Sequence, residues 1–162
     1  MGVDFISCVK RNGGLKLVEP NQNLAQVYLR KSRSALNMLN SALEKHENEW
    51  VLDTSYYARY FAVYALFMQA GLKSEIHDCT ILGFKRLFSG LIDPAMHLEL
   101  EESKEMRIKA IYYDESFGNE AIIKMAKNAP RFCLRMEQVL RGLTDAQIDA
   151  LRGKFSANSQ LA

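Results

Sequence analysis

The stretch from Asp53 to Gly71 restricts the possible folds of this chain more than any other part of the sequence. Apolar and aromatic side chains cover nearly every helical turn of it, namely Tyr56, Tyr57, Tyr60, Phe61, Val63, Tyr64, Leu66 and Phe67. A helix that is apolar around most of its circumference is usually buried in the centre of a bundle. Asp53 is suited to cap its start and Gly71 to close its end. The stretch therefore predicts the central helix of an all-α fold.

Arg59 is the only charged side chain inside this apolar stretch. An unpaired charge is very costly to bury, so a buried Arg59 needs a partner. We interpret Arg59 as one half of a structural ion pair with a Glu on another long helix. A role in binding a ligand is the alternative.

Composition favours one globular domain without a strong electrostatic field. The 162 residues are 48% hydrophobic and 25% charged, with a net charge of +2. This small charge does not favour nucleic acid or membrane, although a local basic patch is compatible with it. The longest apolar run is too short and too interrupted to span a bilayer, and the N-terminus lacks the apolar core of a signal peptide. We therefore expect a cytoplasmic protein that does not associate with membranes.

The three cysteines favour the same location. Cys8, Cys79 and Cys133 are odd in number and widely spaced. This pattern is more typical of reduced thiols than of a disulfide framework, and no pair has the spacing of zinc ligands. We expect neither a metal nor a cofactor.

Periodic apolar residues predict further helices around the central one. Before the central helix they cover 4–11 and about 22–46, and after it 75–88, about 99–113, 120–141 and a short tail helix. Together they predict an all-α, up-and-down bundle of four or five main helices, with a short N-terminal helix and a short C-terminal helix. The chain then divides into an N-terminal extension (1–21), the bundle (22–142) and a tail (143–162).

Several connecting segments carry more specific expectations. Asn21 or Asn23 can cap the first long helix, and Thr144 and Gln147 have capping-box spacing for the tail helix. Trp50 is expected to plug the end of the core. Residues 91–100, which contain Pro94, read as an exposed connector, and the final residues, SANSQLA, as a frayed end.

His77 is the histidine with the clearest functional potential. It lies near Lys73 and Asp78 at the start of a predicted helix. It is either a helix-start histidine bonded to a neighbour or a polar residue at a groove mouth that meets RNA or a partner. The other two, His46 and His97, fall in polar connectors and are expected to be exposed.

Arg107 and the tyrosines after it form a second polar and aromatic cluster. Tyr112 follows Arg107 by one to two helical turns, an arrangement that suits either the edge of a core or base stacking. Candidate binding residues are thus Arg59, Lys73, Tyr57 and Tyr112, beside the candidate catalytic residues His77 and Arg107.

Three segments together resemble the HEPN family, small helical-bundle proteins of prokaryotes, in particular its uncharacterised archaeal and bacterial subgroup. AQVYLRKSRSALNMLNSAL resembles the opening helix of the family. SYYARYFAVYALFMQAGLKSEIHDCTI resembles its signature, and RIKAIYY followed by AIIKMAKNAPRF resembles its closing helices. The resemblance covers roughly residues 22–141, and DFISCVKRN with LVEP is similar to the N-terminal extension of archaeal members.

This resemblance implies a helical bundle that often forms a homodimer. It also implies a minimal nucleotidyltransferase as partner, with which many members form a toxin–antitoxin pair. Active toxins of the family are metal-independent endoribonucleases whose motif is an Arg with a His shortly after it. Such a His would move protons for the ribose 2′-OH, and the Arg would stabilise the charge on the phosphorus.

The nuclease motif is not intact in this sequence. Arg107 matches the family Arg, but Ile108 replaces the usual polar residue and Tyr112 stands where the His is expected. A phenol, with its pKa near 10, is a poor general base at neutral pH. We therefore favour a binding module for RNA, a nucleotide or a nucleotidyltransferase partner. The alternative is an endoribonuclease that uses His77 with Arg59 or Arg107 brought close in space.

Overall fold

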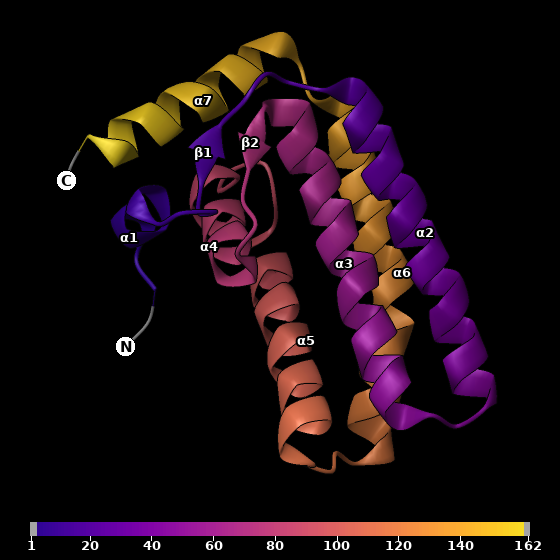
Figure 1. Ribbon diagram of the computed structural model, residues 1–162. Helices are drawn as coiled ribbons and strands as arrows, with labels where there is room; N and C mark the ends of the chain where they lie inside the picture. Colours follow the sequence, from indigo (N-terminus) through magenta and orange to yellow (C-terminus); the bar gives the residue numbers. More distant parts are fainter. Residues whose placement is uncertain (1–2, 161–162) are drawn as a thin grey trace.

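The computed structural model describes residues 3–160, and within them it contains seven helices and one two-stranded sheet. In chain order these are α1 (Phe5–Lys10), β1 (Lys16–Leu17), α2 (Gln22–Glu44), α3 (Asn48–Ala70), β2 (Leu72–Lys73), α4 (His77–Leu87), α5 (Pro94–Tyr113), α6 (Asn119–Gly142) and α7 (Asp145–Ser159). The long helices α2, α3, α5 and α6 form an up-and-down bundle, and α1, α4 and α7 gather at one end of it (Figure 1). The predicted all-α bundle with short terminal helices is confirmed.

Helix α3 is the central helix, as its apolar surface predicts. It packs against α2, α5 and α6, and fifteen of its residues are buried. It ends at Gly71, whose φ of 71° lies in the left-handed region that favours glycine. Its start differs from the prediction, because it begins at Asn48 after an N-cap residue, Glu47, that makes no side-chain cap. Asp53 therefore lies inside the helix, where its carboxylate is available to another partner.

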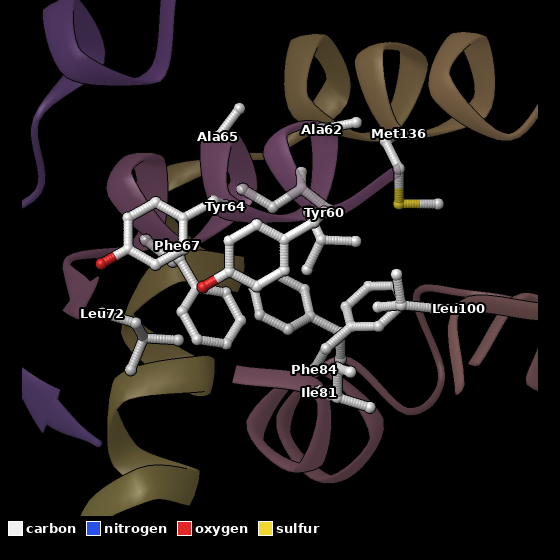
Figure 2. Packing of buried hydrophobic residues seen from close by; sticks show 14 of the residues in the cluster. Tyr60, Ala62, Tyr64, Ala65, Phe67, Leu72, Ile81, Phe84, Leu100 and Met136 are labelled. Carbon is white, nitrogen blue, oxygen red and sulfur yellow. The ribbon is translucent and has the colours of Figure 1, made fainter. Parts of the chain in front are cut away.

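The larger core cluster includes the region where α3 meets α4 and α5. Figure 2 shows aromatic side chains of α3 packed against apolar side chains of these two helices, the labelled ones being Tyr60, Tyr64, Phe67, Ile81, Phe84 and Leu100. The rings of Phe67 and Phe88 stack with their centroids 5.8 Å apart. This packing holds the first turn of α4 over the tyrosines of α3.

Two predicted caps are present. The side chain of Asn21 accepts from the backbone N–H of Leu24 at 2.9 Å at the start of α2. Thr144 and Gln147 form a reciprocal capping box at the start of α7. The predicted fraying of the tail is wrong as far as Ser159, because α7 continues to that residue and its Phe155 packs edge-on against Phe5. Residues 161–162, the last part of that prediction, lie outside the described residues.

Most of the predicted connector at residues 91–100 is instead the beginning of α5, which starts at Pro94. Asp93 caps this helix by accepting from the N–H of Ala95, and Pro94 occupies its first turn. Proline is well tolerated there because the first turn needs no backbone donor. His97, expected to be exposed, is only 5% exposed and packs against Phe84.

Trp50 does not plug the core. It lies on the first turn of α3 and is 59% exposed. With Met38 of α2 it borders a hollow of about 310 Å³ on the outer face of these two helices. Because the helix already includes Trp50, its side chain lies on the face that points away from the buried Val51, Leu52 and Ser55.

The expectation of reduced thiols is wrong for two of the three cysteines. Cys8 of α1 and Cys79 of α4 form a disulfide across 71 residues of sequence, with their Cα atoms 5.4 Å apart. Sequence spacing could not reveal this pair, because tertiary packing of the N-terminal segment on α4 brings the two residues together. Cys133 is buried and free. The cytoplasmic location loses this line of support.

Within residues 3–160, no helix combines the length and the apolar character that crossing a membrane requires. The β1–β2 pair joins the N-terminal segment to the end of α3, with Leu17 opposite Leu72 and Lys16 opposite Lys73. It holds the chain after α3 in place just before α4 begins.

Candidate functional site

His77 is the first residue of α4, and its imidazole lies on the tyrosines of α3. The rings of His77 and Tyr60 stack with centroids 4.2 Å apart and planes inclined by 13°. The Nδ1 atom of His77 is 2.7 Å from the phenol oxygen of Tyr56. Burial lowers the pKa of His77, and the charges of Arg107 and Lys104 lower it further against the opposing effect of Asp78. The imidazole is therefore neutral at pH 7.

The tautomer of this neutral imidazole follows from its bond to Tyr56. The phenol of Tyr56 is completely buried, and its oxygen has no hydrogen-bond partner among the described residues other than His77. Burial raises the pKa of Tyr56, so the phenol keeps its proton, and the proton must be donated to Nδ1 to avoid a buried unsatisfied O–H. Nδ1 is then the acceptor, and Nε2 carries the hydrogen. His77 thus presents an N–H donor rather than a free lone pair.

Arg107 approaches the same tyrosines from α5. Its guanidinium lies 4.9 Å from the ring centroid of Tyr57 and 5.4 Å from that of Tyr56. Its Nε donates to Asp53 Oδ1 at 2.6 Å, and the side chain of Arg107 is 14% exposed. Asp53 thus fixes the arginine over the rings instead of capping α3.

The fold therefore brings His77 and Arg107 together on Tyr56 and Tyr57, which are adjacent residues of α3. The His77 ring meets Tyr57 edge-on at a centroid distance of 6.1 Å. Tyr57 is half-buried, so part of its surface is open beside both polar groups. We call His77, Arg107, Tyr56 and Tyr57 the polar–aromatic cluster.

Charges around this cluster are largely compensated. Lys104 is paired with Asp78 beside His77, and Lys73 with Glu75 at 3.0 Å. A compensated site attracts a ligand through ring stacking and directed hydrogen bonds more than through a long-range field. In the described part of the chain, no group of three His, Cys, Asp or Glu side chains is arranged to hold a metal ion.

Arg59 lies elsewhere, in the interior of the bundle. It is 0% exposed, and its guanidinium is 2.9 Å from Glu99 Oε1 through Nε and 2.8 Å through Nη2. It also donates to the backbone carbonyls of Ser55 and Met125 at 3.0 and 2.7 Å. The predicted structural ion pair is present, between Arg59 and Glu99. All three nitrogens of the Arg59 guanidinium donate to groups inside the protein.

The remaining candidates lie outside the cluster. Tyr112 is 66% exposed near the end of α5, and Lys73 lies in β2, where it is half-buried beside its exposed partner Glu75. Sequence reasoning missed Tyr56, Tyr60 and Asp53 as members of the site. The one signal for them was spacing, because Asp53 and Tyr57, like Tyr56 and Tyr60, are four residues apart and share a helix face.

The family model described as HEPN domain matches residues 25–141. The matched segment contains nearly all of α2 to α6, and with them every residue of the polar–aromatic cluster. Among curated proteins, no sequence matches this chain significantly.

Proposed function

The chain belongs to the HEPN domain family, and on this premise we propose that it is a binding module for RNA or a nucleotide. The binding site is the polar–aromatic cluster. The observation that supports it most is the meeting of His77, from α4, and Arg107, from α5, on the same two tyrosines.

Each member of the cluster has a role that suits a nucleotide. The open part of the Tyr57 ring offers a stacking surface for a base, and arginine guanidinium groups stack on bases or bind phosphate. The Nε2–H of His77 donates to a phosphate or base oxygen. Nε2 makes no hydrogen bond within residues 3–160 and is not among the fully buried polar atoms, so it is available to a ligand.

Binding of a fluorescent single-stranded RNA octamer, measured by anisotropy in the absence of metal, tests this proposal. Arg107→Gln should weaken binding about tenfold, in line with the loss of one charged contact and its stacking. Arg141→Gln is the matched control, because Arg141 is an exposed arginine at the far end of α6. Equal affinities for the wild type and both variants would contradict the proposed site.

A second candidate is a metal-independent endoribonuclease, favoured by the same meeting of His77 and Arg107. The tautomer argues against His77 as the base, because Nδ1 accepts from Tyr56 and Nε2 carries hydrogen. Total tRNA incubated without metal separates the two functions. Cleavage that is lost in His77→Ala and kept in His46→Ala would establish the nuclease, and intact tRNA bound by the protein supports the binding module.

We also propose, from family membership, a homodimer and a minimal nucleotidyltransferase as protein partner, in a toxin–antitoxin-like pair in the cytoplasm. The uncovered apolar surface at Trp50 and Met38 supports a protein contact, since exposed apolar patches often mark such sites. Sedimentation of the wild type and of Trp50→Lys tests the homodimer. A monomeric wild type at micromolar concentration would contradict it.

A further inference from the structure

We propose that a row of aromatic rings extends the polar–aromatic cluster into a track for single-stranded RNA, with about one base stacked on each ring. The aromatic row consists of Tyr57 and Phe61 of α3 and Tyr28 of α2, and Lys31 stands at its far end. This inference rests on the proposed function and adds to it the class of ligand, an unpaired strand of several nucleotides rather than a mononucleotide.

The rings of the row follow one another at nearly even steps. The centroids of Tyr57 and Phe61 are 5.5 Å apart, and those of Phe61 and Tyr28 are 6.1 Å apart. All three residues are half-buried, packed against the core on one side and open on the other. The row begins at the ring that Arg107 covers, so it continues directly from the polar–aromatic cluster.

Cations stand at both ends of the row. Lys31 Nζ is 4.9 Å from the centroid of Tyr28 and 5.6 Å from that of Phe61. Lys31 is exposed and has no ion-pair partner among residues 3–160, while Arg107 lies over Tyr57 at the other end. Both cations lie within reach of a ring face, where a base and its phosphate would bind together.

This charge pattern decides between RNA and an apolar protein partner. An apolar helix of another protein offers no anionic group to Arg107 and Lys31, whereas a nucleic-acid strand presents planar bases and a phosphate backbone. Planar rings with a cation at each end complement the second pattern. Bases paired within a duplex cannot splay onto such rings, so the ligand is a single strand.

The test compares AMP with oligoadenylate RNAs of two, four and eight nucleotides, using the full chain. In the wild type, affinity should rise at least tenfold from AMP to the tetranucleotide as bases occupy the row. Phe61→Leu keeps an apolar side chain in the core but removes one ring, and should lower affinity for the tetranucleotide about five- to tenfold without changing that for AMP.

Lys31→Gln gives a second, surface variant that leaves the core untouched. It should weaken tetranucleotide binding about threefold and reduce the slope of log affinity against log salt by about one. Lys127→Gln, the same change at an exposed lysine of α6 without an ion-pair partner in the described residues, should leave both unchanged.

The outcomes separate the row from the cluster. If affinity does not rise from AMP to the longer oligoadenylates, or if it rises equally in Phe61→Leu, the row is overturned and the proposed function stands. If no nucleotide of any length binds, both fail. Loss of self-association in Phe61→Leu with unchanged RNA affinity would overturn the row as well, because a second copy of the chain would then be its occupant.

Discussion

Arg59 and Arg107 both meet the central helix α3, but their surroundings differ. Arg59 lies inside the bundle, where Glu99 and two backbone carbonyls accept from all three of its nitrogens. Arg107 lies at the edge, where Asp53 orients it but its planar group rests on tyrosine rings next to solvent. The comparison teaches that an arginine whose donors are all used internally serves the fold, whereas one that is oriented but open is suited to a ligand.

The largest expected effect comes from removing the buried ion pair between Arg59 and Glu99. Arg59→Met should lower the free energy of unfolding by about 3–5 kcal/mol, because it leaves the Glu99 carboxylate and the Met125 carbonyl without their partner. Urea denaturation followed by circular dichroism measures this. Adding Glu99→Met to Arg59→Met should recover part of the lost free energy of unfolding. If Arg59→Met alone lies within about 1 kcal/mol of the wild type, the distinction between the two arginines fails.

Replacing Arg107 should have a small effect on stability and a large effect on RNA binding. Arg107→Gln should cost only about 1–2 kcal/mol of stability, since its ion pair with Asp53 lies at the partly exposed edge of the bundle. The same variant should show the tenfold loss of RNA affinity expected above. A loss of stability as large as that of Arg59→Met, without loss of affinity, would make Arg107 a second structural arginine.

The buried imidazole of His97 adds a third polar side chain to the comparison. Within residues 3–160 neither of its ring nitrogens has a hydrogen-bond partner, and burial lowers its pKa. His97→Leu should therefore raise the free energy of unfolding by about 1 kcal/mol at pH 7. Differential scanning calorimetry of the variant would show this, and a destabilised variant would mean that His97 has a partner in solution.

The pH dependence of the same variant follows from the lowered pKa. The unfolded chain binds a proton at this histidine near pH 6.5, while the folded chain binds it only at lower pH. Wild-type stability is therefore fully present above about pH 6.5 and decreases as pH falls toward the folded pKa. The gain from His97→Leu should be larger at pH 5 than at pH 7.

An effect of about the same small size concerns the bond that orients His77. Tyr56→Phe removes the phenol that donates to Nδ1 and should cost about 1 kcal/mol. It should also convert the single Nε2–H tautomer of His77 into a mixture, which ¹⁵N shifts of the imidazole report. A mixture already present in the wild type would contradict the assignment of His77 as a donor.

The fold could be predicted well because its signals are local and periodic. The apolar surface of α3, the glycine at its end and the caps at Asn21 and Thr144 depend on neighbours a few residues away. The start of α5 was missed because Pro94 signals both a break and a first helical turn. Trp50 was expected to plug the core because the helix was expected to begin at Asp53, whereas α3 begins at Asn48 and includes Trp50.

The candidate site was predictable only in part. The sequence identified His77 and Arg107 as candidate catalytic residues, but it left Arg59 open as an alternative partner of His77. Which arginine reaches the histidine depends on the packing of α4 and α5 on α3, as does the meeting of Cys8 with Cys79. Tyr56 was assigned to the core and is buried, yet its buried phenol determines which nitrogen of His77 carries hydrogen.

The histidine ring signals of the ¹⁵N-labelled protein, recorded while a short single-stranded RNA is added, test the central claim most directly. The three histidines lie in different places: His77 in the polar–aromatic cluster, His97 inside the bundle and His46 in the turn between α2 and α3. The polar–aromatic cluster as binding site predicts saturable shifts of His77 with His97 and His46 unchanged. RNA binding that leaves His77 unchanged would contradict it.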